Sequence, residues 1–148
     1  MLSLENGEVT ELAAGLDRPY GVAVSGAGTV YVSQPDEGRV VKISGGKAET
    51  VLDGLGWPEG IAIRGDMLYA VESGAKQVAE LDLNTGAHRV LAGNLPVGTP
   101  PGVAPLRLGG VGDMCGPMWS FTGIAAGSDG AIYVSGDAEG SVIAIRPA

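Results

Sequence analysis

The sequence predicts an all-β protein built from a repeated unit of four short antiparallel strands. Short runs rich in β-branched and aromatic residues recur along the chain, and tight-turn residues separate them. No window keeps apolar residues at helical spacing. Glycine is frequent, with 26 residues in 148, and this favours turns over helices.

The first whole unit spans residues 19–52, and the second spans residues 58–91. The pattern Pro-x-Gly-Val/Ile-Ala opens both units, at Pro19 and again at Pro58, about 39 residues later. Four strands are expected in the first unit, over residues 19–24, 28–33, 39–43 and 48–52. The recurrence indicates that the unit is a structural module.

Partial units stand at both ends of the sequence. Residues 122–146 repeat the first three strands and stop before an outer strand. Residues 2–13 match the last two strands of a unit, and Asn6-Gly7 is a strong hairpin signal between them. We therefore expect three to three-and-a-half units in the chain.

A period near 40 residues with four strands per unit is typical of β-propeller blades. Blades pack around an axis, and a closed ring needs roughly four to eight of them. Two alternatives follow. Either two chains pair as half-rings into a six-bladed homodimer, with the strand at 8–13 completing the last blade of the partner, or the sequence is half of a longer product.

Residues 93–121, between the second and third units, are rich in glycine and proline and carry only Arg107 and Asp113 as charges. Proline excludes central strands, and loops of this length in compact domains are usually functional or disordered. The segment is interpreted either as a lid over the axial mouth or as padding against a neighbouring blade or the partner chain.

The net charge of −8 and the lack of a Lys/Arg cluster argue against binding to nucleic acid or to an anionic membrane surface. Cys115 is the only cysteine, so no intrachain disulfide can form, and His88 is the only histidine, so a multi-histidine metal site within one chain is excluded. No signal peptide or membrane-spanning run is seen, which makes a cytoplasmic location the expectation and secretion the alternative.

At the Pro-x-Gly-Val/Ile-Ala openings and the Val/Leu/Ile-Tyr-Val/Ala second strands, the units resemble NHL-type repeats. They are also similar to blades of the SMP-30/gluconolactonase/strictosidine-synthase-like propellers. The resemblance covers most of the chain outside residues 93–121. It implies a β-propeller and leaves the activity open, because this superfamily includes lactonases, a lyase, a condensing enzyme and binding modules.

The lactonases of this group hold a divalent metal with residues just before the glycine of the opening pattern. The equivalent positions here are Tyr20, Glu59 and Thr122. The resemblance therefore implies Glu59 as a metal ligand and Thr122 as a weaker one, and the chain departs from the pattern at Tyr20. A calcium or magnesium site needs several oxygens, so other blades would have to supply the rest.

Acidic residues gather in the turns that follow the second strands, on the face that the opening motifs share. With Glu59 added, this rim consists of Asp36, Glu37, Glu59, Glu72, Asp137 and Glu139. An acidic rim would concentrate cations or repel anionic ligands, although solvated charge in polar turns is the simpler interpretation. Trp57 and Trp119 precede first strands, where they would either line the mouth and stack on a sugar or cation, or pack between blades.

These observations favour a binding and assembly module that presents an acidic top face to a ligand or partner. Ser33 and Ser135 have no nearby histidine or other base, so we assign no hydrolytic triad and no catalytic residue. The alternative is a metal-dependent lactonase-like hydrolase, with a cation such as calcium on Glu59 and its site completed by a partner or by missing blades. The candidate ligand-binding residues are Glu59, Glu72, Trp57, Trp119 and Tyr20.

Overall fold

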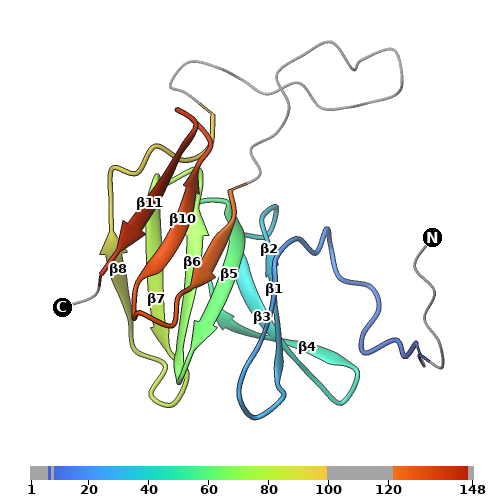
Figure 1. The fold of residues 1–148 in the computed structure, drawn as a ribbon. Coiled ribbons are helices and arrows are strands. Elements are labelled where there is room, and N and C mark those ends of the chain that lie inside the picture. The colour runs from blue at the N-terminus through green and yellow to red at the C-terminus, as the bar shows by residue number, and fades with distance from the viewer. Residues whose placement is uncertain (1–6, 8, 100–121, 147–148) are drawn as a thin grey trace, which may run out of the picture.

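The computed structural model describes residues 7, 9–99 and 122–146. Within these residues the chain is all β, with eleven strands in three antiparallel sheets and no helix. The sheets stand side by side in chain order, so the second sheet lies between the first and the third (Figure 1). The predicted all-β class of antiparallel blades is confirmed.

Each sheet follows the order of its strands along the chain. The first consists of β1 (Val22–Val24), β2 (Val30–Gln34), β3 (Arg39–Ser44) and β4 (Lys47–Leu52). The second consists of β5 (Pro58–Arg64), β6 (Met67–Glu72), β7 (Gln77–Asp82) and β8 (His88–Ala92). The third consists of β9 (Ile124–Ala126), β10 (Ile132–Gly136) and β11 (Ser141–Ile145).

The first two sheets also repeat an irregularity. The pairing register shifts between Val40 and Val41 where β3 meets β4, and between Val78 and Ala79 where β7 meets β8. These are equivalent positions of the unit. A bulge increases the local right-handed twist of a strand pair, so the outer strands of both blades are twisted at the same place.

The described residues 9–16 form no strand, although an outer strand was predicted up to residue 13. Val9 and Leu12 are exposed there. The prediction required pairing with another chain, and a strand without a neighbour has no partner for its backbone groups. The rest of the predicted partial blade lies outside the described residues.

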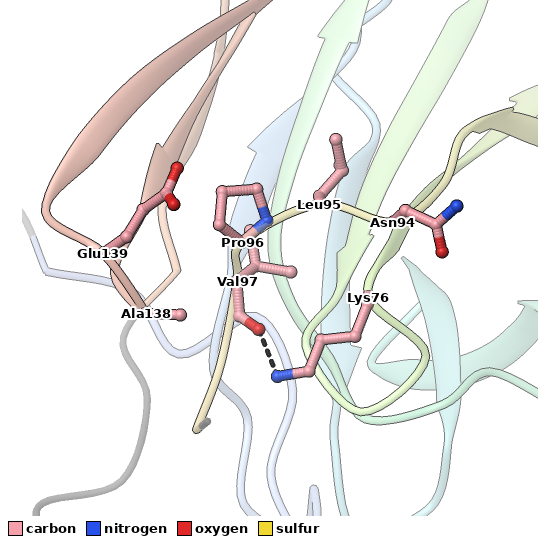
Figure 2. Close-up of a pocket in the computed structure, with 7 residues that line it drawn as sticks. All are labelled: Lys76, Asn94, Leu95, Pro96, Val97, Ala138 and Glu139. Atoms are coloured by element: carbon pink, nitrogen blue, oxygen red, sulfur yellow. Dashed lines mark hydrogen bonds between the residues drawn. The ribbon is translucent and has the colours of Figure 1, made fainter. Parts of the chain in front are cut away.

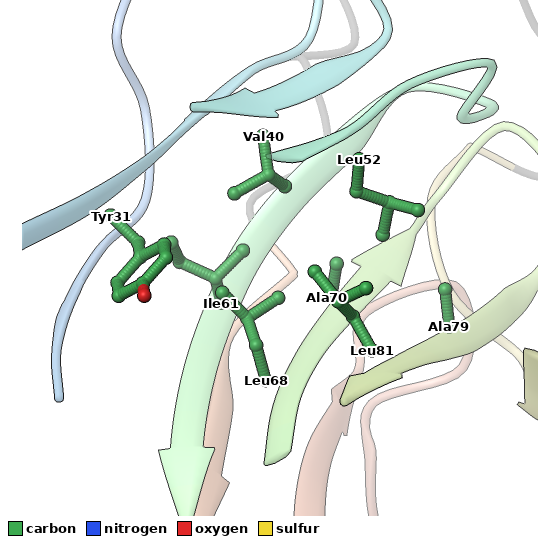
Figure 3. Packing of buried hydrophobic residues seen from close by; sticks show 8 residues of the cluster. All are labelled: Tyr31, Val40, Leu52, Ile61, Leu68, Ala70, Ala79 and Leu81. Carbon is green, nitrogen blue, oxygen red and sulfur yellow. The ribbon is translucent and has the colours of Figure 1, made fainter. Parts of the chain in front are cut away.

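The apolar core consists of two clusters, one at each junction between sheets. The first interblade core lies between the first and second sheets (Figure 3); it contains Tyr31, Val40, Leu52, Ile61, Leu68, Ala70, Ala79 and Leu81. The second interblade core lies between the second and third sheets; it contains Tyr69, Val71, Val78, Val97, Ile132 and Val134. Each sheet therefore buries its apolar side chains against a neighbouring sheet, as blades of a propeller do.

Residues 95–99 begin the long glycine- and proline-rich segment and pack against the second and third sheets. Val97 is fully buried in the second interblade core. The Ala138 N–H donates to the Pro96 carbonyl at 3.1 Å, and the Leu95 N–H donates to the Lys76 carbonyl at 2.9 Å. This part of the segment acts as padding between blades, whereas residues 100–121 lie outside the described residues.

The part of the chain that the structure describes contains no helix that could span a bilayer.

Candidate functional site

The opening motifs of the three blades stack directly on one another. A Cβ atom built on Gly21 would lie 2.5 Å from the Glu59 carbonyl oxygen, and one built on Gly60 would lie 2.8 Å from the Thr122 carbonyl oxygen. Only glycine permits such an approach of neighbouring backbones. The residue before each glycine is thereby brought beside its counterpart in the next blade, which gathers Tyr20, Glu59 and Thr122.

Glu59 is fully buried and connects the second blade to the third. Its Oε1 accepts a hydrogen bond from the Ser73 hydroxyl at 2.8 Å, and its Oε2 accepts one from the Thr122 N–H at 2.7 Å. Hydrogen bonds to a charged acceptor are among the stronger ones in proteins, and a buried carboxylate requires them. Both carboxylate oxygens therefore have protein donors in this chain.

Asp137 makes the corresponding connection in the third blade. Its Oδ1 accepts hydrogen bonds from the Thr122 hydroxyl at 2.9 Å and from the Gly98 N–H at 2.8 Å. Ser73 and Asp137 both directly follow a second strand, at equivalent positions of the repeat. Ser73 was not among the residues predicted from the sequence, and the signal that could have found it is this shared position beside the opening motif.

Tyr20 contributes a phenol to the same cluster. Its pKa is raised to about 12, first by burial and then by the negative charges of Glu59 and Asp137, while Arg18 acts in the opposite direction. At neutral pH the phenol therefore keeps its proton and can donate a hydrogen bond to a ligand. It cannot act as a base there.

Trp57 lies at the rim of this cluster, beside Arg18. The guanidinium carbon of Arg18 is 5.5 Å from the centre of the Trp57 ring, and its Nη1 is 3.1 Å from a carboxylate oxygen of Asp36. Trp57 adopts a left-handed backbone conformation, with φ of 62°, which is rare for a bulky residue. The Trp57 ring is therefore in cation–π contact with a guanidinium group of its own chain.

Glu72 clamps the segment that leads into its own blade. Its Oε2 accepts a hydrogen bond from the Gly56 N–H at 2.6 Å, and its Oε1 accepts one from Gln77 at 2.8 Å. In the first blade Gln34 occupies the same position and donates to the Asp17 carbonyl at 2.8 Å. The repeated contact indicates a structural role for this position.

Each carboxylate of the predicted acidic rim has a protein contact; Glu37 lies 3.9 Å from Arg39, and Glu139 accepts a hydrogen bond from the Ser141 hydroxyl at 3.2 Å. Asp36 pairs with Arg18, and Glu59, Glu72 and Asp137 all accept hydrogen bonds from protein donors. Trp119 lies outside the described residues. The structure thus brings Tyr20 and Glu59 together in one cluster and places Glu72 in a separate blade contact.

The described residues do not fit a divalent metal on their own. No group of three or more His, Cys, Asp or Glu side chains among them could hold an ion. Tyr20 is a neutral phenol, and the carboxylate of Glu59 is already paired with two donors. Metal ligation by Glu59 stays a prediction that needs ligands from elsewhere.

A separate groove of about 420 Å³ lies where the second blade meets the third. Figure 2 shows Lys76 on one side and Glu139 on the other, with Leu95, Pro96 and Val97 between them. The Lys76 ammonium group donates to the carbonyl of Val97, and also to that of Thr99 at 2.6 Å. Its charge therefore holds the segment 95–99 in place.

In sequence, no family model and no curated protein matches this chain. In structure, it is similar to a virginiamycin B lyase from Staphylococcus aureus at 15% identity, with a TM-score of 0.57 over 88% of this chain and 41% of that one. An aldose sugar dehydrogenase from Streptomyces coelicolor gives 18% identity and a TM-score of 0.59, over 94% and 47% of the two chains. A gluconolactonase from Xanthomonas campestris gives 21% and 0.54, over 78% and 34%.

These similar structures are β-propellers, and the fold of this chain is therefore that of a partial β-propeller. Identities this low show the fold alone. The chain spans less than half the length of each of these proteins.

Proposed function

We propose that this chain is a β-propeller binding and assembly module, in which two copies close a six-bladed ring and present the polar cluster around Glu59 to a ligand. The proposal depends on side chains that repeat in all three blades but are buried in only two of them. They belong to the faces at which blades meet.

One residue of the third strand carries the proposal most directly. Val40, Val78 and Val142 are equivalent positions of the three blades. Val40 and Val78 have no exposed surface and lie in the first and second interblade cores, whereas Val142 is 76% exposed. The face of the third blade that bears Val142 thus has the composition of a blade interface and no described blade against it.

The opposite face of the first blade shows the complementary feature. Val22 and Val24 in β1 are 61% and 57% exposed. Their equivalents in the second blade are Ile61, which is buried in the first interblade core, and Ile63, which packs against that core. The first and third blades therefore each expose the apolar face that an additional blade would cover.

The outer edge of the third blade offers a second point of closure. β11 is the last strand of its sheet, and no described strand pairs with its outer edge. Open edges invite strand addition. Residues 9–13, of which 9–12 are exposed, repeat part of an outer strand and would supply this strand to a partner.

For the ligand, the half-buried Tyr20 phenol is the hydroxyl of this cluster that a small molecule would contact. Glu59 and Thr122 are buried and bonded within the chain, so they would contribute negative charge and support beneath that phenol, not direct contacts. This set, in a chain of net charge −8, suits a small polar or cationic molecule better than an anion. The ring would place two such clusters around one axis.

Light scattering tests the assembly. We expect a particle of twice the chain mass of 14.8 kDa at micromolar concentration, because a closed two-fold ring leaves no face open for further growth. A particle of single-chain mass at several hundred micromolar protein would contradict the proposal. A series of larger species would indicate open-ended association instead of a closed ring.

A calcium titration by calorimetry separates this function from the lactonase-like alternative. We expect no binding at sub-millimolar calcium, because an ion would have to displace the donors on Glu59 and on Glu72. Saturable binding that Glu59→Gln abolishes and Glu72→Gln leaves unchanged would favour the metal-dependent alternative. Circular dichroism of both variants controls for unfolding.

A further inference from the structure

We infer that Gly123 and Ser135, on the open face of the third blade, form the docking site for the first blade of a second copy. In this contact the Ser135 hydroxyl donates a hydrogen bond to the carbonyl of the partner's Tyr20. The inference rests on the proposed ring and specifies the register of its interface. It follows from one serine hydroxyl contact, which joins two blades at the first junction and is incomplete at the open face of the third blade.

At the junction of the first and second blades, Ser33 connects three backbone groups. Its hydroxyl accepts a hydrogen bond from the Gly21 N–H at 2.8 Å and donates one to the Glu59 carbonyl of the next blade at 2.5 Å. The Ser33 N–H donates to the Gly21 carbonyl at 2.9 Å. Ser33 is buried, so this hydroxyl joins two blades without access to water.

The third blade contains the same arrangement without its last contact. The Ser135 hydroxyl accepts from the Gly123 N–H at 2.7 Å, and the Ser135 N–H donates to the Gly123 carbonyl at 3.0 Å. Among the described residues, the only acceptor near this hydroxyl is the same Gly123 carbonyl, at 3.5 Å. That distance is at the limit for a hydrogen bond, so the hydroxyl is positioned for an acceptor from a following blade.

The opening glycines also differ between the two observed junctions and the open face of the third blade. At Gly21 and Gly60 an added Cβ would meet the carbonyl of the next blade at 2.5 and 2.8 Å. At Gly123 the nearest described atom is the Ser135 hydroxyl oxygen, at 3.6 Å. None of these glycines has a positive φ, so the backbone conformation does not require glycine there. The close approach of the next blade's backbone explains why Gly21 and Gly60 are glycines, and we assign the same role to Gly123.

The shape and chemistry of the open face suit the first blade. A shallow depression of about 310 Å³ lies next to Gly123 and Ser135, lined in part by Ala125, Tyr133 and Val142. At the two observed junctions this space receives the first strand of the following blade, with Ile61 at one and Ile124 at the other. The first blade of a second copy would insert Val22, which is equivalent to both and exposed here.

The register of the repeat identifies the acceptor. Ser33 binds the carbonyl of Glu59, the residue before the opening glycine of the following blade. Ser135 is equivalent to Ser33, and Tyr20 is equivalent to Glu59. Docking would therefore place the partner's Tyr20 beside Thr122 and Asp137, so each ligand cluster of the ring would contain residues from both copies.

Glycine-to-alanine substitution tests this inference. In Gly123→Ala the new methyl group meets only the Ser135 hydroxyl among the described residues of its own chain, but it would collide with the partner's carbonyl. We expect the variant to fold like the wild type and its dimerisation to weaken at least about 100-fold, because the added methyl group overpacks both junctions between the two copies. Gly26→Ala, at an open turn position with no atom within 4 Å, is the matched control and should dimerise normally.

The outcomes separate the inference from the proposed function. A wild-type dimer that Gly123→Ala dissociates, with an unchanged circular dichroism spectrum and urea midpoint in the monomer, supports both. A dimer that persists equally in Gly123→Ala and Ser135→Ala leaves the assembly in place and overturns this docking site. A wild type that stays monomeric at several hundred micromolar overturns both.

Discussion

At the scale of single residues, Glu59 shows how a position can be selected from sequence while its contacts stay unknown. The sequence analysis selected it because it precedes an opening glycine next to the axis. Its two donors, Ser73 and Thr122, lie 14 and 63 residues further along the chain. No local pattern contains such partners, so only the packing of the blades reveals them.

Tyr20 supports a prediction on pH dependence. Its pKa is raised from the ordinary value of 10.0 to about 12 in the fold, so the folded chain keeps a proton that the unfolded chain releases between these values. Stability from this group is complete below pH 10 and is lost as the pH rises towards 12. The pKa values of Tyr69 and Tyr133 are also raised in the folded chain, so these two phenols change the stability with pH in the same direction.

We therefore expect the urea midpoint to fall between pH 10 and pH 12, and to fall less steeply in Tyr20→Phe. The variant removes the phenol that ionises and keeps the aromatic ring. Urea unfolding monitored by circular dichroism at a series of pH values measures the slope. An identical slope in the variant and the wild type would show that Tyr20 does not contribute to it.

At the scale of elements, the strands and turns were predictable because their signals are local. The alternation of β-branched and aromatic residues with tight turns placed β2 and β3 within two residues of where they lie. β1 is shorter than expected, since it begins at Val22 and not at Pro19. Gly21 instead makes the close contact with the backbone of the next blade, and the Tyr20 N–H donates to the Ser33 carbonyl of its own blade at 3.0 Å.

The three equivalent valines of β3, β7 and β11 give a prediction at this scale. We expect Val78→Ala to lower the free energy of unfolding of the monomer by about 2 kcal/mol, because a fully buried side chain loses its contacts and leaves a cavity. Val142→Ala should change it by less than about 0.5 kcal/mol, because that side chain is exposed in the single chain.

Urea unfolding of both variants, made in the monomeric Gly123→Ala background, measures the difference. Equal destabilisation by the two substitutions would contradict the assignment of Val142 to an open blade face. We expect Val78→Ala to destabilise the dimer at least as much as the monomer, because Val78 lies in the second interblade core, which is formed within one chain.

At the scale of the whole molecule, three sheets packed in a row bury two interfaces and leave two exposed. A propeller removes such exposed faces by closing its ring. The comparison structures, of which this chain covers 34–47%, are more than twice as long. The proposed two-fold ring supplies the missing blades from a second copy and explains the exposed valines at both ends.

The sequence by itself determined the blade: its four strands, its turns, its period and its opening motif, because these depend on residues close together in the chain. Only the tertiary structure decided which side chains share a site. Glu59 joins Thr122, Asp137 joins Gly98, and Val97 fills a core between blades, since each contact joins residues that packing brings together across long separations. The physical reason is that hydrogen bonding along a strand is a local property, whereas burial depends on the neighbouring blade.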